Sequence, residues 1–178
     1  VAEWLAIEDT DLPFVYAAGL GWSDPAPSDA QGSLLRFDPL ARGGDLGFRC
    51  AYSLTAPADT PEPLPEDFTS PRDPVRMLLI RAGEQHVQIT PPSRYARPNT
   101  PLSATFELPA YYVDTRPVSV SRYVAFLESR GRRVSEHLAK LLISDPEGPA
   151  KGVSWSDAGE YAAWVGKRLL SEADRKSV

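Results

Sequence analysis

The hydrophobic pattern after residue 74 predicts two strands followed by a short extended piece. The apolar run of residues 75–83 (VRMLLIRAG) is typical of a buried strand that ends at Gly83. Residues 85–89 (QHVQI) alternate polar and apolar positions, so we expect them to form the hairpin partner of that strand. Residues 106–114 (FELPAYYVD) predict a third extended piece.

Two amphipathic helices are predicted next. In residues 117–131, Ser119 or Ser121 is placed to cap the first turn and Gly131 to end the helix. In residues 152–169, Ser154 and Asp157 have the spacing of a capping box. The apolar positions recur at helical spacing in both, and they are Val120, Tyr123, Phe126 and Leu127, then Ala158, Tyr161, Ala162 and Val165. Gly166 is expected to end the second helix, and residues 136–148 predict one more short helix between the two.

The segment before residue 54 predicts short strands and tight loops, because its apolar pieces are brief and separated by Gly, Asp and Pro. Residues 54–74 differ in composition, since six of the 21 are proline and five are acidic. This composition predicts a semi-stiff solvated linker, and the alternative is a long surface loop within one domain. The order of strands and helices predicts an α+β fold class.

The composition argues against several classes of function and of binding site. The 178 residues contain 19 basic and 24 acidic side chains, a net charge of −5, which disfavours a nucleic-acid partner. The single cysteine excludes an internal disulfide and a Cys-rich zinc site, and two histidines are too few for a His-rich metal site. No apolar run approaches the ~18 residues of a membrane span. Localisation stays open, because the missing initiator methionine indicates a piece of a longer chain with an upstream sequence of unknown kind.

Several motifs resemble the formylglycine-generating enzyme (sulfatase-modifying factor) family. Residues 77–84 (MLLIRAGE) are similar to the opening strand of the family, and residues 106–119 to its next conserved segment. Residues 152–158 (GVSWSDA) and 161–169 (YAAWVGKRL) resemble its most specific signature. Residues 1–4 (VAEW), 19–25 (GLGWSDP) and 45–51 (DLGFRCA) resemble the opposite, carboxyl-terminal end of the family domain.

Along this chain, the resemblance to the family domain therefore runs in the order carboxyl-terminal part, linker, amino-terminal part. One interpretation is a tandem fragment, with residues 1–53 as the carboxyl-terminal part of one copy, 54–74 as linker and 75–178 as the amino-terminal part of a second copy. The other is one circularly permuted copy, which is feasible because the termini of a domain often lie close together. Residues 175–178 (RKSV) fit no family pattern and indicate a frayed end.

The resemblance implies a C-type-lectin-like fold and two possible metals. The oxygen-dependent enzymes of the family bind copper(I) with two cysteines, and soft thiolates suit that ion. No cysteine lies between Trp22 and Phe48, the matching region, and Cys50 is expected to be a small buried hydrophobe. We therefore predict no catalytic residues and no copper in this chain. Glu3 matches a family glutamate that binds calcium, and the alternative is a partly buried carboxylate satisfied by backbone groups.

The remaining candidates have structural interpretations. His137 is expected to be structural or solvated, and His86 to occupy an exposed strand position. Asp157 is expected to stabilise a helix start, where a negative charge complements the dipole, and Arg168 to pair with a core carboxylate. The run at 130–133 (RGRR) is expected to be a solvated helix end. Three aromatic residues at helical spacing indicate core rather than a ligand cage; they are Trp155, Tyr161 and Trp164.

The sequence thus predicts a non-catalytic binding module within a larger, bacterial-style protein. Its ligand would be a peptide, a protein or a small molecule, and its other partners the neighbouring domains of the parent chain. The alternatives are a fragment of a copper-dependent oxidase whose cysteines lie outside residues 1–178, and a structural spacer.

Overall fold

The computed structural model describes residues 2–6, 15–18, 34–42, 44, 46–54, 64–89, 102–171 and 174–175. The strands are β1 (Ala2–Trp4), β2 (Val15–Ala18), β3 (Leu34–Phe37), β4 (Leu46–Gly47), β5 (Cys50–Ser53), β6 (Asp67–Ser70), β7 (Asp73–Ile80), β8 (Gly83–Ile89), β9 (Leu102–Leu108), β10 (Tyr111–Asp114) and β11 (Arg168–Leu169). The helices are α1 (Val120–Ser129), α2 (Glu136–Ser144) and α3 (Trp155–Trp164). Every helix in the described residues is too short or too polar to cross a bilayer.

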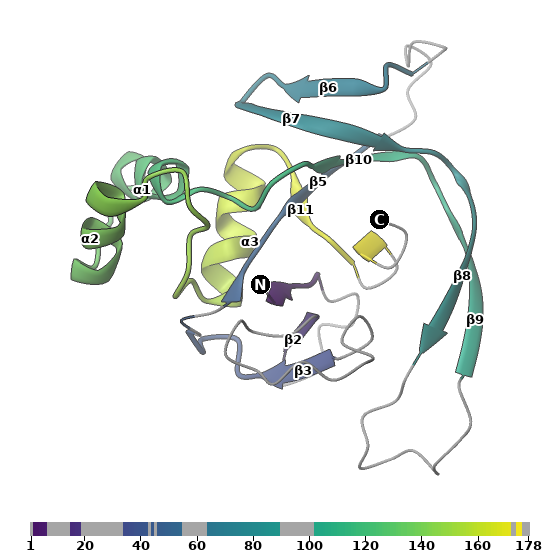
Figure 1. Cartoon of the computed structure of the whole chain (residues 1–178), viewed down its shortest axis with the longest axis horizontal. Helices are drawn as coiled ribbons and strands as arrows, with labels where there is room; N and C mark the ends of the chain where they lie inside the picture. Colours follow the sequence, from purple (N-terminus) through teal and green to yellow (C-terminus); the bar gives the residue numbers. More distant parts are fainter. Residues whose placement is uncertain are drawn as a thin grey trace.

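The strands of this part of the chain form three sheets. Their orders are β3-β2-β1-β4, β11-β5-β10-β7-β6 and the two-stranded ribbon β8-β9. The helices lie to one side of the five-stranded sheet, and the ribbon curves away from its other end (Figure 1). Strands and helices occupy largely separate stretches, so the predicted α+β class agrees with the structure.

The centre of the five-stranded sheet joins strands that are far apart in sequence. β5 is antiparallel to β10, with Ala51 opposite Val113, and antiparallel to β11, with Cys50 opposite Leu169. All four residues of β10 are buried, since Tyr111 and Val113 belong to one apolar cluster while Tyr112 packs on Phe68 and Asp114 binds Lys167. A strand covered on both faces has a continuous apolar pattern instead of an alternating one.

The predicted helices are confirmed, together with most of their capping residues. The Oγ of Ser154 accepts a hydrogen bond from the Asp157 backbone N–H at 3.2 Å, which caps α3. Ser119 precedes α1 at the N-cap position, but its hydroxyl contacts the hydroxyl of Ser121 instead of a backbone N–H. Positive φ angles follow the ends of α1 and α3 at Gly131 (63°) and Gly166 (74°), a conformation that favours glycine.

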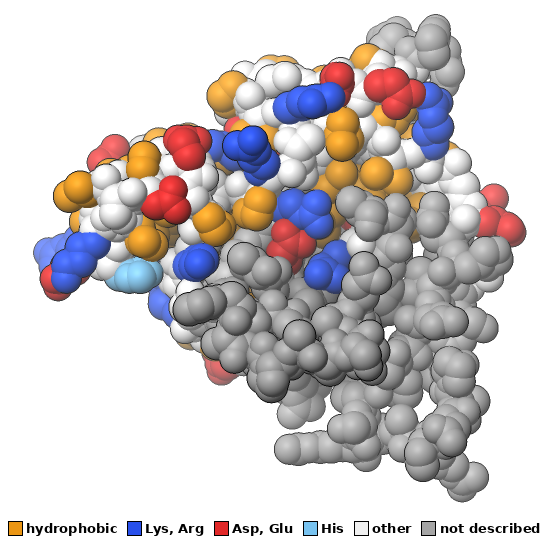
Figure 2. All heavy atoms as spheres, in the orientation of Figure 1, with side chains coloured by type: hydrophobic (Ala, Val, Ile, Leu, Met, Phe, Trp, Pro, Cys, Tyr) orange, Lys and Arg blue, Asp and Glu red, His pale blue; other side chains and the backbone are white. Residues whose placement is uncertain are grey.

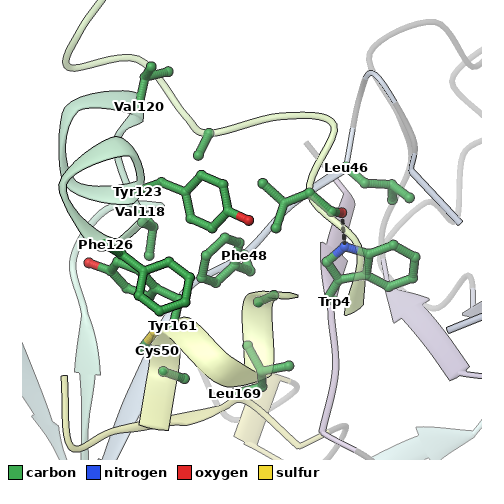
Figure 3. Close-up of a cluster of buried hydrophobic side chains, with 14 of the residues drawn as sticks. Trp4, Leu46, Phe48, Cys50, Val118, Val120, Tyr123, Phe126, Tyr161 and Leu169 are labelled. Carbon is green, nitrogen blue, oxygen red and sulfur yellow. Dashed lines mark hydrogen bonds between the residues drawn. The ribbon is translucent and has the colours of Figure 1, made fainter. Parts of the chain in front are cut away.

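The main core is built from both ends of the sequence (Figure 3). Trp4 and Phe48, from the first third of the chain, are buried beside the helices, and the ring of Phe48 lies 5.5 Å from that of Tyr161. The Trp4 indole Nε1 donates a hydrogen bond to the Val153 carbonyl at 2.9 Å, drawn as a dashed line in Figure 3. The predicted helix stripes are buried in this cluster. Their members are Val120, Tyr123, Phe126, Leu127, Ala158, Tyr161, Ala162 and Val165.

The predicted hairpin between residues 75–83 and 85–89 is wrong. β7 ends at Ile80, and its two edges are taken by β6 and β10, so no edge remains for β8. β8 instead pairs with β9 through seven residue pairs, from Gly83 opposite Leu108 to Ile89 opposite Leu102. β7 is also less buried than its apolar sequence predicts, since Leu78 is 41 % exposed.

Part of the predicted linker is sheet. Residues 67–70 form β6 and residue 73 begins β7, both within residues 54–74. Two of its acidic residues have partners, because Asp67 accepts a hydrogen bond from Arg76 and Asp73 is buried against Lys167. The ring of Phe68 packs against the rings of Tyr52 and Tyr112. The local composition shows the prolines and the charges, but not these partners, which come from β5, β7, β10 and the residues after α3. Residues 55–63 lie outside the described residues.

Candidate functional site

Glu3, the predicted calcium ligand, lies in an ion cluster. Its side chain is 7 % exposed on β1. Arg49 donates two hydrogen bonds to its carboxylate, Nε to Oε1 at 2.7 Å and Nη2 to Oε2 at 3.1 Å. Arg175 brings a second guanidinium, with its Nε 3.6 Å from Oε2. The side chains of Arg49 and Arg175 are 20 % and 19 % exposed, so the cluster reaches the surface.

A second ion pair, between Arg168 and Asp174, lies next to the first, because Asp174 directly precedes Arg175 in the chain. Arg168 on β11 binds the carboxylate of Asp174 and lies over the ring of Tyr111, with its guanidinium carbon 5.6 Å from the ring centre. Burial alone favours the neutral carboxyl of Asp174, but hydrogen bonds from Arg168 and Ser171 outweigh it and lower its pKa. The expected pairing of Arg168 with a buried carboxylate is confirmed. We call this set the arginine cluster: Arg49, Arg168 and Arg175 with Glu3 and Asp174.

The arginine cluster has one more positive than negative side chain. Calcium prefers several oxygen ligands around a cation, whereas the carboxylate of Glu3 already holds a bidentate guanidinium. The described residues contain no group of three or more His, Cys, Asp or Glu side chains placed to hold a metal ion. Glu3 and its contacts therefore do not fit a calcium ion well, and calcium binding stays a prediction of the resemblance.

Cys50 has the environment that the sequence predicts. Its side chain is fully buried in β5, within the main core. Burial raises the pKa of the thiol, and the Asp114 carboxylate raises it further. Copper(I) needs soft thiolate ligands, and this chain offers one buried thiol and no second cysteine. The residues of this chain do not fit the copper site that the resemblance implies for the oxidases.

A buried charge cluster lies beside Cys50. Lys167 Nζ contacts Asp114 Oδ1 at 2.6 Å and Asp73 Oδ2 at 2.7 Å, and all three side chains are at most 2 % exposed. Arg122 from α1 also binds Asp73. Burial raises the pKa of Asp114, and Lys167 only partly offsets this effect. The charges balance within the cluster once Arg122 is included, and only Arg122 is partly exposed, at 19 %. The cluster therefore joins β7, β10, α1 and the residues after α3.

Asp157 does more than begin a helix. Its carboxylate accepts a hydrogen bond from Arg42 at 2.5 Å and one from Arg132 at 2.6 Å. Burial alone raises the pKa of Asp157, but the hydrogen bonds from Arg132 and Ser154 outweigh it and the pKa falls below the ordinary value. Arg132 also binds Glu160. The run at 130–133 is exposed as expected, with Arg132 37 % exposed, but the local pattern does not show that Asp157 and Glu160 of α3 bind the Arg132 guanidinium.

The histidines and aromatic residues divide as follows. His137 is exposed on α2, in agreement with its solvated interpretation. The side chain of His86 lies outside the described residues. Tyr161 is buried in the main core, and Trp155 and Trp164 pack against that core, so the core interpretation of these three rings is confirmed.

Sequence reasoning missed the partners that define these clusters. Lys167 follows α3, and no local pattern indicates that its side chain is fully buried between two carboxylates. Arg175 lies in the segment interpreted as a frayed end, yet it contacts Glu3 from the other end of the chain. The sequence shows many charged residues next to the buried motifs, but it does not show which of them form ion pairs.

Comparison with known proteins identifies the family. A family model described as the sulfatase-modifying factor enzyme 1-like domain matches residues 64–177, more than half of the chain. The chain belongs to this family. The match includes the segments at 77–84, 106–119 and 152–169 on which the resemblance rests. The resemblance of residues 1–53 lies outside the matched range and stays a prediction.

Relatives of this sulfatase-modifying-factor-like chain include proteins named serine/threonine-protein kinase Pkn1. Those of Chlamydia trachomatis serovar L2, Chlamydia caviae and Chlamydia pneumoniae are 37 %, 32 % and 29 % identical to it over 84 residues. The similarity covers 38 % of this chain and 14 % of each kinase, so the chain spans a small part of these relatives. No solved structure matches the chain.

Proposed function

We propose that this chain is a non-catalytic recognition module of the sulfatase-modifying factor family. The observation that carries the proposal is the donor set: the family's oxidases need a pair of thiolates for copper(I), and the single cysteine here is fully buried. The fold identity that goes with the proposal is C-type-lectin-like. Similarity to 14 % of each kinase supports a place for the module beside other domains of a longer chain.

The arginine cluster is the proposed recognition site. It combines three guanidinium groups with two carboxylates and is partly exposed. Arg175 Nε forms no hydrogen bond and lies 3.6 Å from Glu3 Oε2, so this guanidinium is held less tightly than that of Arg49 on the same carboxylate. Guanidinium groups bind carboxylates and phosphates with well-defined geometry. The ligand class that fits is a peptide or small molecule with an anionic group.

The surface argues against a polyanion such as nucleic acid. Figure 2 shows Lys and Arg interspersed with Asp and Glu over the described part of one face, without a broad field of one sign. The chain also has a net charge of −5. Recognition would therefore depend on a few placed arginines, not on long-range attraction.

The catalytic part of the proposal is tested with copper. We expect the chain to bind no stoichiometric copper(I) against a competing chelator and to leave a cysteine-containing peptide unoxidised in air. A copper site that is lost in Cys50→Ser would contradict the proposal and support the oxidase interpretation.

The recognition part is tested with an immobilised short peptide that contains a single glutamate, because the proposed ligand carries one anionic group and is not a polyanion. We expect retention that Arg175→Gln weakens, because this variant removes the less tightly held guanidinium and leaves Arg49 on Glu3. The matched control is Arg76→Gln, which removes an exposed arginine paired with Asp67 elsewhere on the surface. Equal retention of both variants and the parent would place the binding outside the arginine cluster. No retention of the parent would favour a spacer.

A further inference from the structure

The amino-terminal segment (residues 2–54) completes a fold whose remainder is residues 64–175. Its strand β5 lies inside the five-stranded sheet, with β10 on one edge and β11 on the other, and both neighbours come from residues 64–175. Figure 1 shows β5 crossing the middle of the molecule between these strands. Without β5, both neighbours would present unpaired backbone groups along a buried edge, which proteins avoid.

Two tryptophans, one from each segment, each donate a hydrogen bond to a backbone carbonyl of the other segment. The Trp4 indole donates to the Val153 carbonyl at 2.9 Å, and the Trp155 indole donates to the Leu5 carbonyl at 2.6 Å. Each hydrogen bond joins one segment to the other across about 150 positions. Trp4 is fully buried in a core to which both segments contribute. Burial of large aromatic side chains with satisfied N–H groups is among the stronger sources of binding energy.

Backbone and charged contacts add to this interface. The Val118 N–H donates to the Phe48 carbonyl at 3.0 Å, and the Ala6 N–H donates to the Leu170 carbonyl at 2.7 Å. Arg42 reaches Asp157 on α3. All of these groups lie outside residues 55–63. The contacts that hold the two segments together therefore do not require the peptide connection between them.

The connecting positions 55–63 are numerous enough to span the distance between the two segments without determining how they pack. The end of β5 and the start of β6 lie toward the same end of the sheet, since Ser53 is opposite Tyr111, Tyr111 opposite Ile80, and Asp67 opposite Leu78. Two strands separate them, a distance of about 14 Å at the usual strand spacing. The nine positions 55–63 can span roughly 30 Å when extended.

We propose that residues 64–175 form an acceptor that binds residues 2–54 as a separable strand donor. The partner that fits the acceptor is a segment with the Trp4 anchor and the β5 strand, here supplied by the same chain. The inference does not depend on the proposed recognition function. Of the two interpretations of the motif order, it favours the permuted copy over the tandem fragment.

The experiment uses the whole chain with a cleavage sequence for a site-specific protease inserted within residues 55–63. After cleavage we expect the two fragments to co-elute as one 1:1 species at about 10 µM, with an unchanged circular dichroism spectrum. Because cleavage makes folding bimolecular, the melting temperature of the cleaved protein should rise with concentration, whereas that of the intact protein should not. Separation or aggregation of the fragments would overturn the proposal.

Two matched variants in the donor identify the anchor. In the cleaved protein, Trp4→Ala should weaken association about 100-fold or more, because truncation of a buried tryptophan leaves a large cavity. Leu40→Ala, in the same segment but 73 % exposed, should leave association unchanged. If Trp4→Ala prevents folding of the intact chain, Trp155→Phe removes the donor to Leu5 and should weaken association more mildly. Equal association of all variants would show that Trp4 is not the anchor.

Discussion

Lys167 Nζ lies 2.6 Å from Asp114 Oδ1, and neither side chain is exposed to solvent. The ammonium group also binds Asp73, so one cation balances two carboxylates together with Arg122. Removing one partner from a buried ion pair leaves the other charged groups without compensation. This cluster joins strands and helices from several parts of the chain, and its loss should affect the whole domain.

Lys167→Met should lower the free energy of unfolding by about 3–5 kcal/mol. The measurement is urea denaturation followed by tryptophan fluorescence. Lys140→Met is the control, because Lys140 pairs with Glu136 on the exposed face of α2 and such surface pairs contribute about 0.5 kcal/mol or less. A loss of under about 1 kcal/mol for Lys167→Met would show that the cluster contributes little to stability.

The carboxylates of Asp157 and Asp174 should make the stability of the domain depend on pH in acid. The pKa values of Asp157 and Asp174 lie below the ordinary value of 3.8 in the folded state. Their stabilising contribution is therefore complete above pH 3.8 and is lost as the pH falls through the lower folded-state values. Asp114 has the opposite sign, because its raised pKa gives a contribution that is lost as the pH rises through the folded-state value.

We expect urea midpoints that fall below about pH 4 and a smaller fall in the double variant Asp157→Asn with Asp174→Asn. Asp67→Asn is the control, since Asp67 is 58 % exposed in its pair with Arg76. If the double variant and the control gave the same acid slope, other groups would control acid unfolding.

Cys50 should be chemically silent in the folded protein. Burial raises the pKa of its thiol, so both the thiolate and access for a reagent are lacking at neutral pH. We expect no reaction with Ellman's reagent in native buffer and one thiol per chain in urea. Lys167→Met offers a useful comparison, since loosening of the adjacent cluster should speed the labelling. Rapid labelling of the parent chain would contradict the described burial.

Gly166 and Gly159 should respond in opposite ways to substitution by alanine, because only Gly166 has a left-handed backbone conformation. Gly166 has φ = 74° after α3, so Gly166→Ala should destabilise by about 1 kcal/mol through backbone strain, although the nearest atom would be 3.9 Å away. Gly159 lies within α3 with nothing near its position for a Cβ, so Gly159→Ala should stabilise by about 0.5–1 kcal/mol. Thermal unfolding measures both, and equal effects would be inconsistent with a left-handed residue at 166.

The helices could be predicted from the sequence because their signals are local. Capping residues, apolar spacing and terminal glycines all act within about one turn of the chain, and these were sufficient for α1, α2 and α3. The burial of Cys50 and the family signature were likewise readable from neighbouring residues. These features alone determined the α+β class, the family and the lack of a copper pair in this chain.

Tertiary structure decided the pairings. β5 lies between β10 and β11, Lys167 binds Asp114, Arg175 reaches Glu3, and Asp157 gathers Arg42 and Arg132. Each contact joins positions that no local periodicity relates, and each side chain has several partners of suitable charge or shape within the sequence. Only simultaneous packing of the two segments selects among them, because a buried charge or strand edge is stable only where its partner is also buried.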